Sequence, residues 1–378
     1  MFEKILNKLE KRVTYISNQD YKPGMFSLER FLAVLSNCYG LAAGLRVRLY
    51  EKEFIKQRKL PCVVISIGNI VAGGAGKTPM AIYLAGLLKE MGKKVVVISR
   101  GYKGKYKDNS LIVSDGNQVF SGAGDSGDEP YMMAKRGAFP VVVGKDRFKA
   151  GIKAINTFNP DVIILDDGFQ HLKLKRDIDL LLLDHLHPFG NKRFLPAGRL
   201  RETPGMSAKR SDAIIFTRSR TNDEKGRTIK EVLKFYPGCP WFKTFHEPFI
   251  YKHIIHDQNL RNRITDISML KGKKAVLFSG IAKNQSFYHT MKESGINVLD
   301  HLEFKDHYRY KKPDVSLINK TAEKVFADVI LTTEKDWAKL DSNIEWKKDL
   351  VVVGINICFQ DPERFRAFLN KKLKTYNE

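Results

Sequence analysis

A glycine-rich segment in the N-terminal part of the chain carries residue types that bind nucleotide phosphates. It consists of Val71, Ala72, Gly73, Gly74, Ala75, Gly76, Lys77 and Thr78. The segment follows a short apolar run and precedes a helical pattern, and in that setting backbone N–H groups face phosphate oxygens. Lys77 is then placed to contact the β- and γ-phosphates, and the Thr78 hydroxyl to bind magnesium. The sequence therefore predicts a site for ATP and Mg²⁺.

The match to the commonest phosphate loop is incomplete. That loop has a glycine five positions before Gly76, where this chain has Val71. The loop of partitioning ATPases has a lysine where this chain has Ala72, and this difference disfavours that class. A glycine-rich turn that binds no nucleotide is the structural alternative.

Two adjacent carboxylates follow a second apolar run. Asp166 and Asp167 come directly after residues 162–165, and ligands of open α/β sheets bind beyond the carboxyl ends of the strands. One of the two aspartates would hold Mg²⁺ and its waters. A helix cap or a turn is the common structural alternative for such a pair, and the phosphate loop upstream weighs against it. Gln170 and His171 follow directly and are placed to line the same cleft.

Further segments place charged or titratable side chains at the ends of predicted elements. Asp128 and Glu129 open a helical pattern, where the sequence alone favours a capping role over a catalytic one. Residues 99–104 and 144–147 follow strand patterns and offer cations to phosphate, with a solvated surface as the alternative. His307 lies between acidic and aromatic neighbours, and a lone histidine is more often structural than catalytic.

The elements that must position these residues alternate along the chain. From residue 61 onward, short apolar runs rich in β-branched residues alternate with helical patterns, which is typical of a parallel sheet covered on both faces. The predicted strands are 62–67, 94–99, 141–143, 162–165 and 178–183, and the predicted helices are 79–91, 129–135 and 148–156. Each crossover is long enough for a strand–helix–strand unit. The fold class is therefore α/β, with a P-loop NTPase-like (RecA-like) N-terminal domain.

A stretch punctuated by proline and glycine, residues 187–204, breaks this pattern and is predicted to be a linker. A second α/β/α domain with a parallel-rich sheet is expected after it. Its predicted strands are 213–217, 274–279 and 329–332, and residues 350–353 are left open between the two sheets. The predicted domains are 1–50, an N-terminal segment with an interfacial membrane helix; 51–186, the P-loop domain; 205–345, the second domain; and 346–378, a segment that packs back on the P-loop domain.

Composition indicates an anionic partner. The 378 residues include 65 Lys+Arg and 42 Asp+Glu, which give a net charge of +23, and such a field favours a polyanion. Nucleic acid and anionic lipid are both candidates, but no recognisable nucleic-acid-binding module is present. The four cysteines are scattered without zinc-ligand spacing, so we expect a reducing compartment and no structural metal.

An uncharged apolar segment, residues 31–45, favours lipid over nucleic acid. It is too short to span a hydrocarbon core, which needs about 20 residues. Arg30 precedes it, and Arg46, Arg48, Lys52, Lys56, Arg58 and Lys59 follow it. Cations at the ends of an apolar helix are typical of a helix that lies in the membrane interface. The structural alternative is an amphipathic helix packed on the protein's own core.

Eight of these segments together resemble the tetraacyldisaccharide 4'-kinase family. They are AGGAGKTP (72–79), SRGYKG (99–104), GDEP (127–130), GKDR (144–147), DDGFQH (166–171), LPAGRLRE (195–202), FKDHY (304–308) and TTEKD (332–336), in the family's order. The resemblance implies transfer of the ATP γ-phosphoryl group to the 4'-hydroxyl of tetraacyldisaccharide 1-phosphate, which forms lipid IV-A in lipid A biosynthesis. It also implies a peripheral protein on the cytoplasmic face of the inner membrane. Its partners would be anionic membrane lipid and the lipid A precursor, with no nucleic acid.

The resemblance also implies roles for individual residues. Asp128 corresponds to the catalytic aspartate and His307 to its partner, which reverses the preference for a capping role. Because these two residues fall in different predicted domains, we expect them to meet only when the domains close. The magnesium-associated residues are Thr78, Glu129, Asp166 and Asp167, and the residues expected to contact substrate or phosphate are Tyr102, Arg147, Gln170 and Arg199.

Two other function classes share part of this pattern. A P-loop kinase for another sugar or a nucleotide would need the phosphate loop but not the apolar residues 31–45. A basic nucleic-acid-binding ATPase would use the net charge of +23 to neutralise a phosphodiester backbone.

Overall fold

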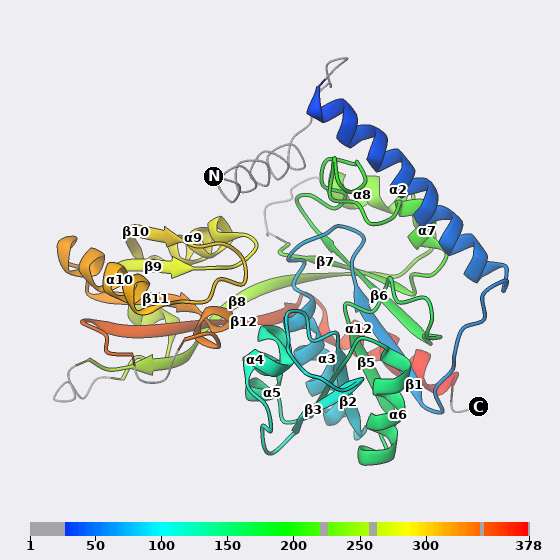
Figure 1. The fold of residues 1–378 in the computed structure, drawn as a ribbon, viewed down its shortest axis with the longest axis horizontal. Coiled ribbons are helices and arrows are strands. Elements are labelled where there is room, and N and C mark those ends of the chain that lie inside the picture. Colours follow the sequence, from blue (N-terminus) through cyan, green and yellow to red (C-terminus); the bar gives the residue numbers. More distant parts are fainter. Residues whose placement is uncertain (1–26, 220–225, 257–262, 341–343, 377–378) are drawn as a thin grey trace. The chain divides into compact units, whose positions relative to one another are not determined.

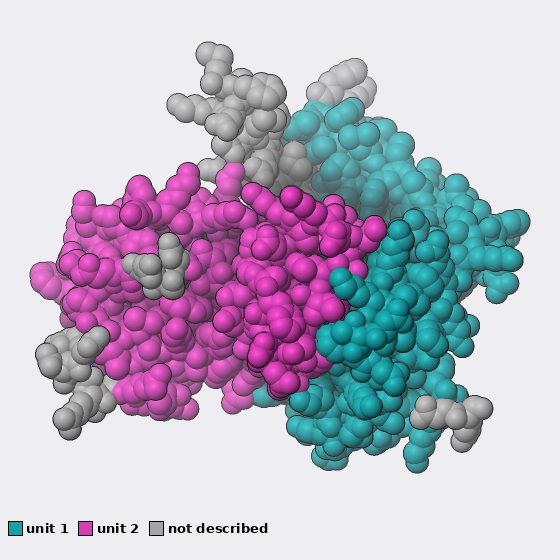
Figure 2. Space-filling view, turned by 60° about the horizontal axis from the view of Figure 1, so that its bottom comes forward, with its two compact units in different colours: residues 1–100, 146–245, 358–378 teal, residues 101–145, 246–357 magenta. Residues whose placement is uncertain are grey.

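The computed structural model describes residues 27–219, 226–256, 263–340 and 344–376 (Figure 1). Contacts between residues divide the chain into two compact units (Figure 2). Unit 1 comprises Met1–Arg100, Asp146–Phe245 and Cys358–Glu378, and unit 2 comprises Gly101–Lys145 and His246–Ile357. Each unit is therefore assembled from separate stretches of sequence. The start of the predicted N-terminal segment, residues 1–26, lies outside the described residues.

Unit 1 is built on a parallel sheet. Its strands are β1 (Val63–Gly68), β2 (Val95–Ser99), β5 (Val162–Asp166), β6 (Ile178–Asp184) and β7 (Ala213–Thr217), in the order β7-β6-β1-β5-β2. Ile65 of the central strand pairs with Ile164 on one side and Ile178 on the other. The residues of β5 are buried throughout. Burial on both faces explains why this strand reads as an unbroken apolar run.

Helices of unit 1 complete its core. They are α2 (Leu28–Glu51), α3 (Lys77–Glu90), α6 (Arg147–Phe158), α7 (Pro204–Ala208), α8 (Arg227–Leu233) and α12 (Pro362–Lys374). Helix α6 begins where the Asp146 carboxylate accepts hydrogen bonds from two backbone N–H groups, the usual role of an N-cap aspartate. In the C-terminal helix, the Phe365 ring stacks on Phe359 with 4.1 Å between centroids and lies 6.5 Å from Tyr83 of α3. The C-terminal helix thus packs on unit 1.

Unit 2 contains a second parallel sheet and an antiparallel pair. The parallel strands are β9 (Lys274–Ser279), β10 (Asn297–Glu303), β11 (Val329–Thr333) and β12 (Asp349–Phe359), in the order β10-β9-β11-β12. The antiparallel pair is β3 (Ser110–Asp115) with β4 (Pro140–Gly144). The helices are α4 (Ala123–Ser126), α5 (Asp128–Arg136), α9 (Asn284–Glu293), α10 (Lys312–Lys324) and α11 (Glu334–Trp337), with a 3₁₀ turn at Ile267–Leu270. Strand β8 (Trp241–Ile254) begins in unit 1 and ends in unit 2, and β12 begins in unit 2 and ends in unit 1 with Cys358 and Phe359.

Alternate residues of the unit 2 strands pack on opposite faces of their sheet. Leu277 and Leu331 belong to a core cluster with Phe287 and Met291 of α9. The intervening residues Val276, Phe278 and Ile330 belong to another cluster with Val315 and Ile318 of α10. The sheet of unit 2 therefore lies between helices on both faces, as the predicted α/β/α architecture requires.

Every strand predicted from the sequence is present, but the structure groups several of them differently. Residues 141–143 form β4, which pairs antiparallel with β3, a strand that was not predicted from the sequence. Residues 213–217 were expected to begin the second domain, yet β7 pairs with β6 in unit 1. Residues 187–204, predicted to be a linker, lie inside unit 1, and residues 101–145 lie in unit 2. These groupings arise from contacts between distant residues, which periodicity does not encode.

Helix α2 packs on unit 1 through small side chains and exposes large apolar ones. Ser36, Gly40 and Gly44 are buried, and a Cβ at Gly40 would lie 2.4 Å from the Phe194 ring. The outward side chains, each at least 37% exposed, are Phe31, Val34, Leu35, Tyr39, Leu41 and Leu45. In the part of the chain that the structure describes, no helix combines the length and apolarity needed to cross a membrane.

Candidate active site

The phosphate loop connects β1 to α3 in unit 1. Gly76 has a φ of 77° and caps the helix, and Lys77 is the first helical residue. Gly73 has a φ of 118°, and a Cβ there would lie 2.3 Å from a terminal nitrogen of Arg199. Both glycines adopt backbone conformations that other residues rarely reach. The glycines are therefore required by the backbone path of the loop and by the close approach of an arginine.

Lys77 lies over its own loop. Its Nζ is 3.4 Å from the Gly73 carbonyl oxygen, 3.4 Å from Asn69 Oδ1 and 3.5 Å from Asp167 Oδ1. Asn69 in turn donates from Nδ2 to the Val71 carbonyl oxygen. These contacts hold the Lys77 ammonium group beside the N-terminus of α3, where a positive charge can interact with phosphate. The predicted magnesium residue Thr78 is buried in the first turn of the same helix.

The predicted carboxylate pair lies at the end of β5. Asp166 is the last residue of the strand and is 2% exposed, and Ser99 Oγ donates to its Oδ2 at 3.2 Å. Asp167 accepts from Arg201 Nη1 at 2.9 Å. Burial raises the pKa of the Asp167 carboxyl, but the charges of Lys77 and Arg201 outweigh burial, so the net pKa is below its usual value. Two carboxylates and the Thr78 hydroxyl supply the oxygen donors that Mg²⁺ prefers.

The segment after the predicted linker lies beside the phosphate loop. Ala72 donates its N–H to the Arg199 carbonyl oxygen at 2.7 Å, and Val71 forms an antiparallel bridge with Leu200. Burial and the nearby charge of Arg218 lower the pKa of the Arg199 guanidinium, while Asp184 raises it. No role was predicted for Arg201 from the sequence, although the residue lies in the segment LPAGRLRE. Spacing gave no sign that this arginine would pair with an aspartate 34 positions away.

Gln170, predicted to contact substrate or phosphate, makes its hydrogen bonds within unit 1. Its Nε2 donates to the Asn69 carbonyl oxygen at 2.8 Å and to Glu202 Oε1 at 2.9 Å, and its Oε1 accepts from Arg201 at 3.0 Å. Glu202 is buried and also accepts from Arg210 at 2.6 Å. Gln170 therefore links the start of the phosphate loop to the LPAGRLRE segment.

Arg147 begins α6 and is 5% exposed. Burial, together with the positive charge of Arg147, lowers the pKa of His171 to about 4, so His171 is neutral near pH 7. The Arg147 charge also helps to lower the pKa of Asp167, after burial, Lys77 and Arg201. Arg147 is thus a buried cation in unit 1.

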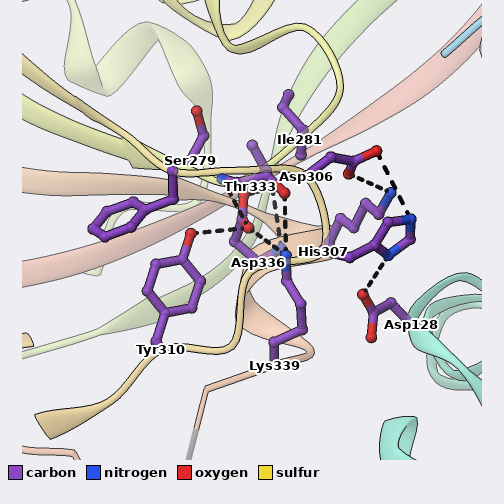
Figure 3. A network of polar contacts seen from close by, with 12 residues as sticks. Asp128, Ser279, Ile281, Asp306, His307, Tyr310, Thr333, Asp336 and Lys339 are labelled. Carbon is purple, nitrogen blue, oxygen red and sulfur yellow. Dashed lines mark hydrogen bonds and ion pairs between the residues drawn. The ribbon is translucent and has the colours of Figure 1, made fainter. Parts of the chain in front are cut away.

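The predicted catalytic pair lies in unit 2. Asp128 is the first residue of α5, and its Oδ2 is 2.9 Å from Nδ1 of His307 (Figure 3). A carboxylate has no proton to give, so Nδ1–H donates and Asp128 accepts. The N-cap position of α5 is occupied by Gly127, so Asp128 is not the N-cap residue that the sequence alone favoured. Both residues belong to unit 2, which contradicts the expectation that they would come from different domains and meet only on closure.

Asp128 is ionised in its surroundings. Burial raises the pKa of its carboxyl, but the hydrogen bond from His307 and the charges of Lys339, His307 and Lys335 outweigh burial, and the net pKa is below its usual value. The exposed ring of Tyr102, predicted to contact substrate, lies 5.5 Å from the His307 ring. The pair is therefore a carboxylate with an oriented imidazole and an aromatic neighbour.

Glu129 and Asp306, the carboxylates next to the pair in sequence, meet one lysine. Lys335 Nζ lies 3.2 Å from Glu129 Oε1 and 3.2 Å from Asp306 Oδ1. Glu129 was predicted to associate with magnesium, and its carboxylate is ion-paired in the structure. Among the described ranges, no three His, Cys, Asp or Glu side chains gather as a metal-binding group. The magnesium role of Glu129 stays a prediction.

A buried network supports the turn that carries His307 (Figure 3). Asp336 is fully buried and accepts from the Gly280 N–H at 3.0 Å and the Tyr310 hydroxyl at 3.0 Å, and it pairs with Lys339 at 2.7 Å. The Gly280 carbonyl oxygen accepts from the N–H of His307 at 3.2 Å. This contact helps to hold His307 at a φ of 61°, a left-handed conformation that non-glycine residues seldom adopt.

Comparisons with known proteins agree on one family. A sequence model of the family described as tetraacyldisaccharide-1-P 4'-kinase (LpxK) matches residues 28–374. The tetraacyldisaccharide 4'-kinase of Desulfatibacillum aliphaticivorans is 38% identical over 376 residues, which cover 98% of this chain and 99% of that protein. The enzyme of the same name from Syntrophus aciditrophicus is 39% identical over 317 residues, 82% of this chain and 83% of that protein.

A solved structure agrees with these relatives. The crystal structure of LpxK from Aquifex aeolicus in complex with ATP is 34% identical and superposes with a TM-score of 0.70. The match covers 92% of this chain and 100% of that chain. The similarity therefore extends over both units.

Proposed function

This chain belongs to the tetraacyldisaccharide-1-P 4'-kinase family, and from that premise we propose which of its residues perform the reaction. The protein transfers the γ-phosphoryl group of ATP to the 4'-hydroxyl of tetraacyldisaccharide 1-phosphate, forming lipid IV-A in lipid A biosynthesis. In our proposal Asp128 accepts the hydroxyl proton, His307 orients Asp128, and residues 71–78 hold ATP. The observation that carries the proposal is the 2.9 Å hydrogen bond between Asp128 and His307.

The pair is suited to accept a proton late in the transfer. The sugar oxygen bonds to the γ-phosphorus, the bond from that phosphorus to the β,γ-bridging oxygen breaks, and the hydroxyl proton passes to Asp128. The pKa of Asp128 is below its usual value, so the group is ionised and ready at neutral pH. Proton transfer to a weak base such as Asp128 becomes favourable once the hydroxyl has become acidic. The hydroxyl becomes acidic as its oxygen bonds to phosphorus.

Unit 1 would supply the electrostatic part of the reaction. Loop N–H groups and Lys77 meet the phosphates, and Thr78, Asp166 and Asp167 would hold Mg²⁺. When bound, Mg²⁺ neutralises charge on the β- and γ-phosphates. Arg199, held against Gly73, is placed to contact phosphate through a guanidinium. In this proposal the buried charge of Arg147 acts at the same site, Gln170 positions the loop, and Tyr102 contacts substrate beside His307.

Helix α2 is proposed to dock on the membrane that carries the substrate. Tetraacyldisaccharide 1-phosphate bears four acyl chains, so the acceptor hydroxyl is presented at a lipid surface. The outward face of α2 exposes Phe31 to 61%, Leu41 to 76% and Leu45 to 59%, and such side chains bury favourably in the interface. Exposed Arg30 and Arg46 would meet anionic headgroups. We place the protein peripherally on the cytoplasmic face of the inner membrane, where ATP is available.

Labelled phosphoryl transfer tests the catalytic assignment. Wild type, Asp128→Asn and Asp125→Asn are incubated with γ-labelled ATP, Mg²⁺ and tetraacyldisaccharide 1-phosphate in detergent. Asp125 is an exposed aspartate of the neighbouring helix α4 and serves as the matched control. We expect label transfer to fall roughly 10²- to 10⁴-fold in Asp128→Asn and to stay at the wild-type rate in Asp125→Asn. A wild-type rate in Asp128→Asn would remove Asp128 as the base.

Vesicle flotation tests the docking face. The double variant Leu41→Asn, Leu45→Asn removes two exposed apolar side chains of α2 without changing net charge. Phe120→Asn removes a side chain of similar exposure, 56%, from unit 2. We expect the α2 variant to float less with phosphatidylglycerol vesicles than wild type and the Phe120 variant to float equally. Equal flotation of all three proteins would count against α2 as the docking element.

A further inference from the structure

We infer that Lys335 of the TTEKD segment is a positioning residue that holds Asp128 and His307 in register through the carboxylate next to each of them. The inference rests on the proposed function, because it presumes that the pair performs the proton transfer. Neither charge nor spacing in the sequence assigned a role to this lysine. Its contacts in unit 2 provide one.

Lys335 contacts both sides of the pair at once. Its Nζ lies 3.2 Å from Glu129 Oε1 and 3.2 Å from Asp306 Oδ1. Glu129 follows Asp128 directly, and Asp306 precedes His307 directly. Asp306 Oδ2 also lies 3.8 Å from Nε2 of His307. One ammonium group therefore connects the start of α5 to the turn that carries the imidazole.

The lysine extends from a fixed support. It lies on α11, whose first turn is capped by the Thr333 hydroxyl accepting from the Asp336 N–H at 3.1 Å. Asp336 is fully buried and paired with Lys339 at 2.7 Å. The Lys335 side chain itself is 17% exposed, so protein surrounds most of its length. Because the residues around Lys335 are rigidly held, its ammonium group can fix the positions of the two carboxylates that it contacts.

A second polar contact joins the same two helices. Arg136, the last residue of α5, lies 3.5 Å from Glu334 of α11 and donates to the Ile355 carbonyl oxygen at 2.8 Å. Helix α5 is thus attached to α11 near both of its ends, by Glu129 to Lys335 and by Arg136 to Glu334. The first attachment is the one beside the reacting carboxylate.

Removing the lysine charge would leave like charges close together. Glu129 and Asp306 share the ammonium group, and Asp128 lies one residue from the first of them. Without Lys335 the carboxylates repel one another at short range in a partly buried setting. We expect α5 and the 304–308 turn to separate slightly, which lengthens the hydrogen bond between Asp128 and His307. Misplacement by about 1 Å at a reacting group can cost roughly 100-fold in rate.

Steady-state and single-turnover kinetics of the full-length protein test this role. The variants are Lys335→Met, Lys335→Arg and, as the matched control, Lys312→Met, which removes an exposed lysine at the start of α10. For Lys335→Met we expect kcat to fall roughly 10- to 100-fold with the Kd for ATP within about twofold of wild type. Lys335→Arg should restore much of the rate, because it keeps the charge. Lys312→Met should resemble wild type.

A double variant shows whether Lys335 acts through Asp128. If it does, Asp128→Asn with Lys335→Met transfers label no more slowly than Asp128→Asn alone, within about twofold. Multiplication of the two losses would overturn the inference, and so would a loss confined to ATP binding or an unchanged rate in Lys335→Met. If Lys335→Met does not fold, Asp306→Asn removes one of the two contacts and should lower kcat in the same selective way. A wild-type rate in Asp128→Asn would instead contradict the proposed function.

Discussion

The two units present their chemistry in different ways. In unit 1 the proposed phosphate site consists mainly of consecutive residues, 71–78, whose backbone path depends on Gly73 and Gly76. In unit 2 the proposed acid–base pair consists of side chains from separate segments, with Asp128 and His307 lying 179 positions apart. A contiguous backbone site can be recognised from spacing alone. A site assembled from distant side chains has no local pattern, and only family resemblance identified it.

The carboxylates of the two units also differ in what keeps them ionised. Burial opposes ionisation of both Asp167 and Asp128, and in both the net pKa is below the usual value. For Asp167 the largest opposing contributions are the cationic charges of Lys77 and Arg201. For Asp128 the largest one is a hydrogen bond from an imidazole. Asp167 is therefore suited to bind a cation, and Asp128 is suited to accept a proton.

Replacing His307 should have the largest effect and should leave the nucleotide site intact. In His307→Ala the hydrogen bond to Asp128 is lost, and we expect kcat to fall roughly 10²-fold or more. The Kd for ATP, measured by calorimetry, should stay within about twofold because the proposed phosphate-binding loop, residues 71–78, lies in unit 1. A loss of ATP affinity in His307→Ala would show that ATP binding also depends on this residue of unit 2.

Glu334 tests the effect of burial on a carboxyl of unit 2 that no lysine contacts. Burial raises its pKa to about 7, with Arg136 acting in the opposite direction. The folded state therefore holds a proton that the unfolded state releases above its usual pKa of 4.5, and stability falls as the pH rises from there to about 7. Glu334→Gln mimics the protonated form. We expect its free energy of unfolding, relative to wild type, to improve by about 3 kcal/mol between pH 4.5 and pH 8.

Urea unfolding at pH 4.5 and pH 8 provides the measurement for Glu334. Wild type should lose more stability than Glu334→Gln between the two pH values, because only wild type has this group to ionise. Parallel pH profiles for the two proteins would mean that the carboxyl titrates near its usual value. Asp125→Asn, at an exposed position, serves as the control for removing a carboxylate.

Replacing Gly73 should have the reverse effect of replacing His307: ATP binding should weaken while kcat is retained. In Gly73→Ala the φ of 118° becomes strained and the new Cβ lies 2.3 Å from the Arg199 guanidinium, which must move. Strain of about 1–3 kcal/mol should raise the Kd for ATP roughly tenfold while kcat at saturating ATP is retained. Gly86→Ala on α3 is the matched control, because a Cβ there meets no atom within 4 Å. An unchanged Kd in Gly73→Ala would contradict the close approach of Arg199.

The smallest expected effect is on the attachment of α2. Ser36 Oγ donates to the Phe194 carbonyl oxygen at 2.8 Å and accepts from the Ala197 N–H at 2.8 Å. Ser36→Ala leaves both backbone groups without this partner, which costs about 1–2 kcal/mol and should lower the melting temperature by a few degrees. Asn37→Ala, an exposed position on the same helix, should not. Equal melting temperatures would show that the two hydrogen bonds contribute little.

The sequence predicted the positions of the strands along the chain better than it predicted which segments pack together. The strands of unit 1 were found because both faces are buried and their residues form apolar runs. Strands β8 and β10 were missed because much of each is only partly buried, which weakens the apolar signal. Residues 101–145 gave no sign of joining residues 246–357, since such contacts leave no periodic trace in the sequence.

For the candidate site too, local patterns could be predicted from the sequence and contacts between distant residues could not. The residues of the phosphate loop were assigned by chemistry, and Asp128 was assigned a capping role until resemblance reversed it. Arg201 and Lys335 were quoted within motifs but received no role, because an ion pair over 34 positions for Arg201 and Asp167, or 206 for Lys335 and Glu129, has no local signature. Contact geometry was needed to identify both.

The two hydrogen bonds of Ser36 have a consequence for the rotation of α2 about its own axis. Successive residues of a helix are turned by about 100°, so a change of one position would turn the Ser36 hydroxyl away from Phe194 and Ala197. The buried Gly40 and Gly44 allow the close approach that makes this setting possible. The angular direction of the exposed apolar side chains is therefore fixed relative to the segment that holds Arg199. The helix therefore has one rotational setting on unit 1, defined by the Ser36 hydroxyl together with the buried face that includes Gly40 and Gly44.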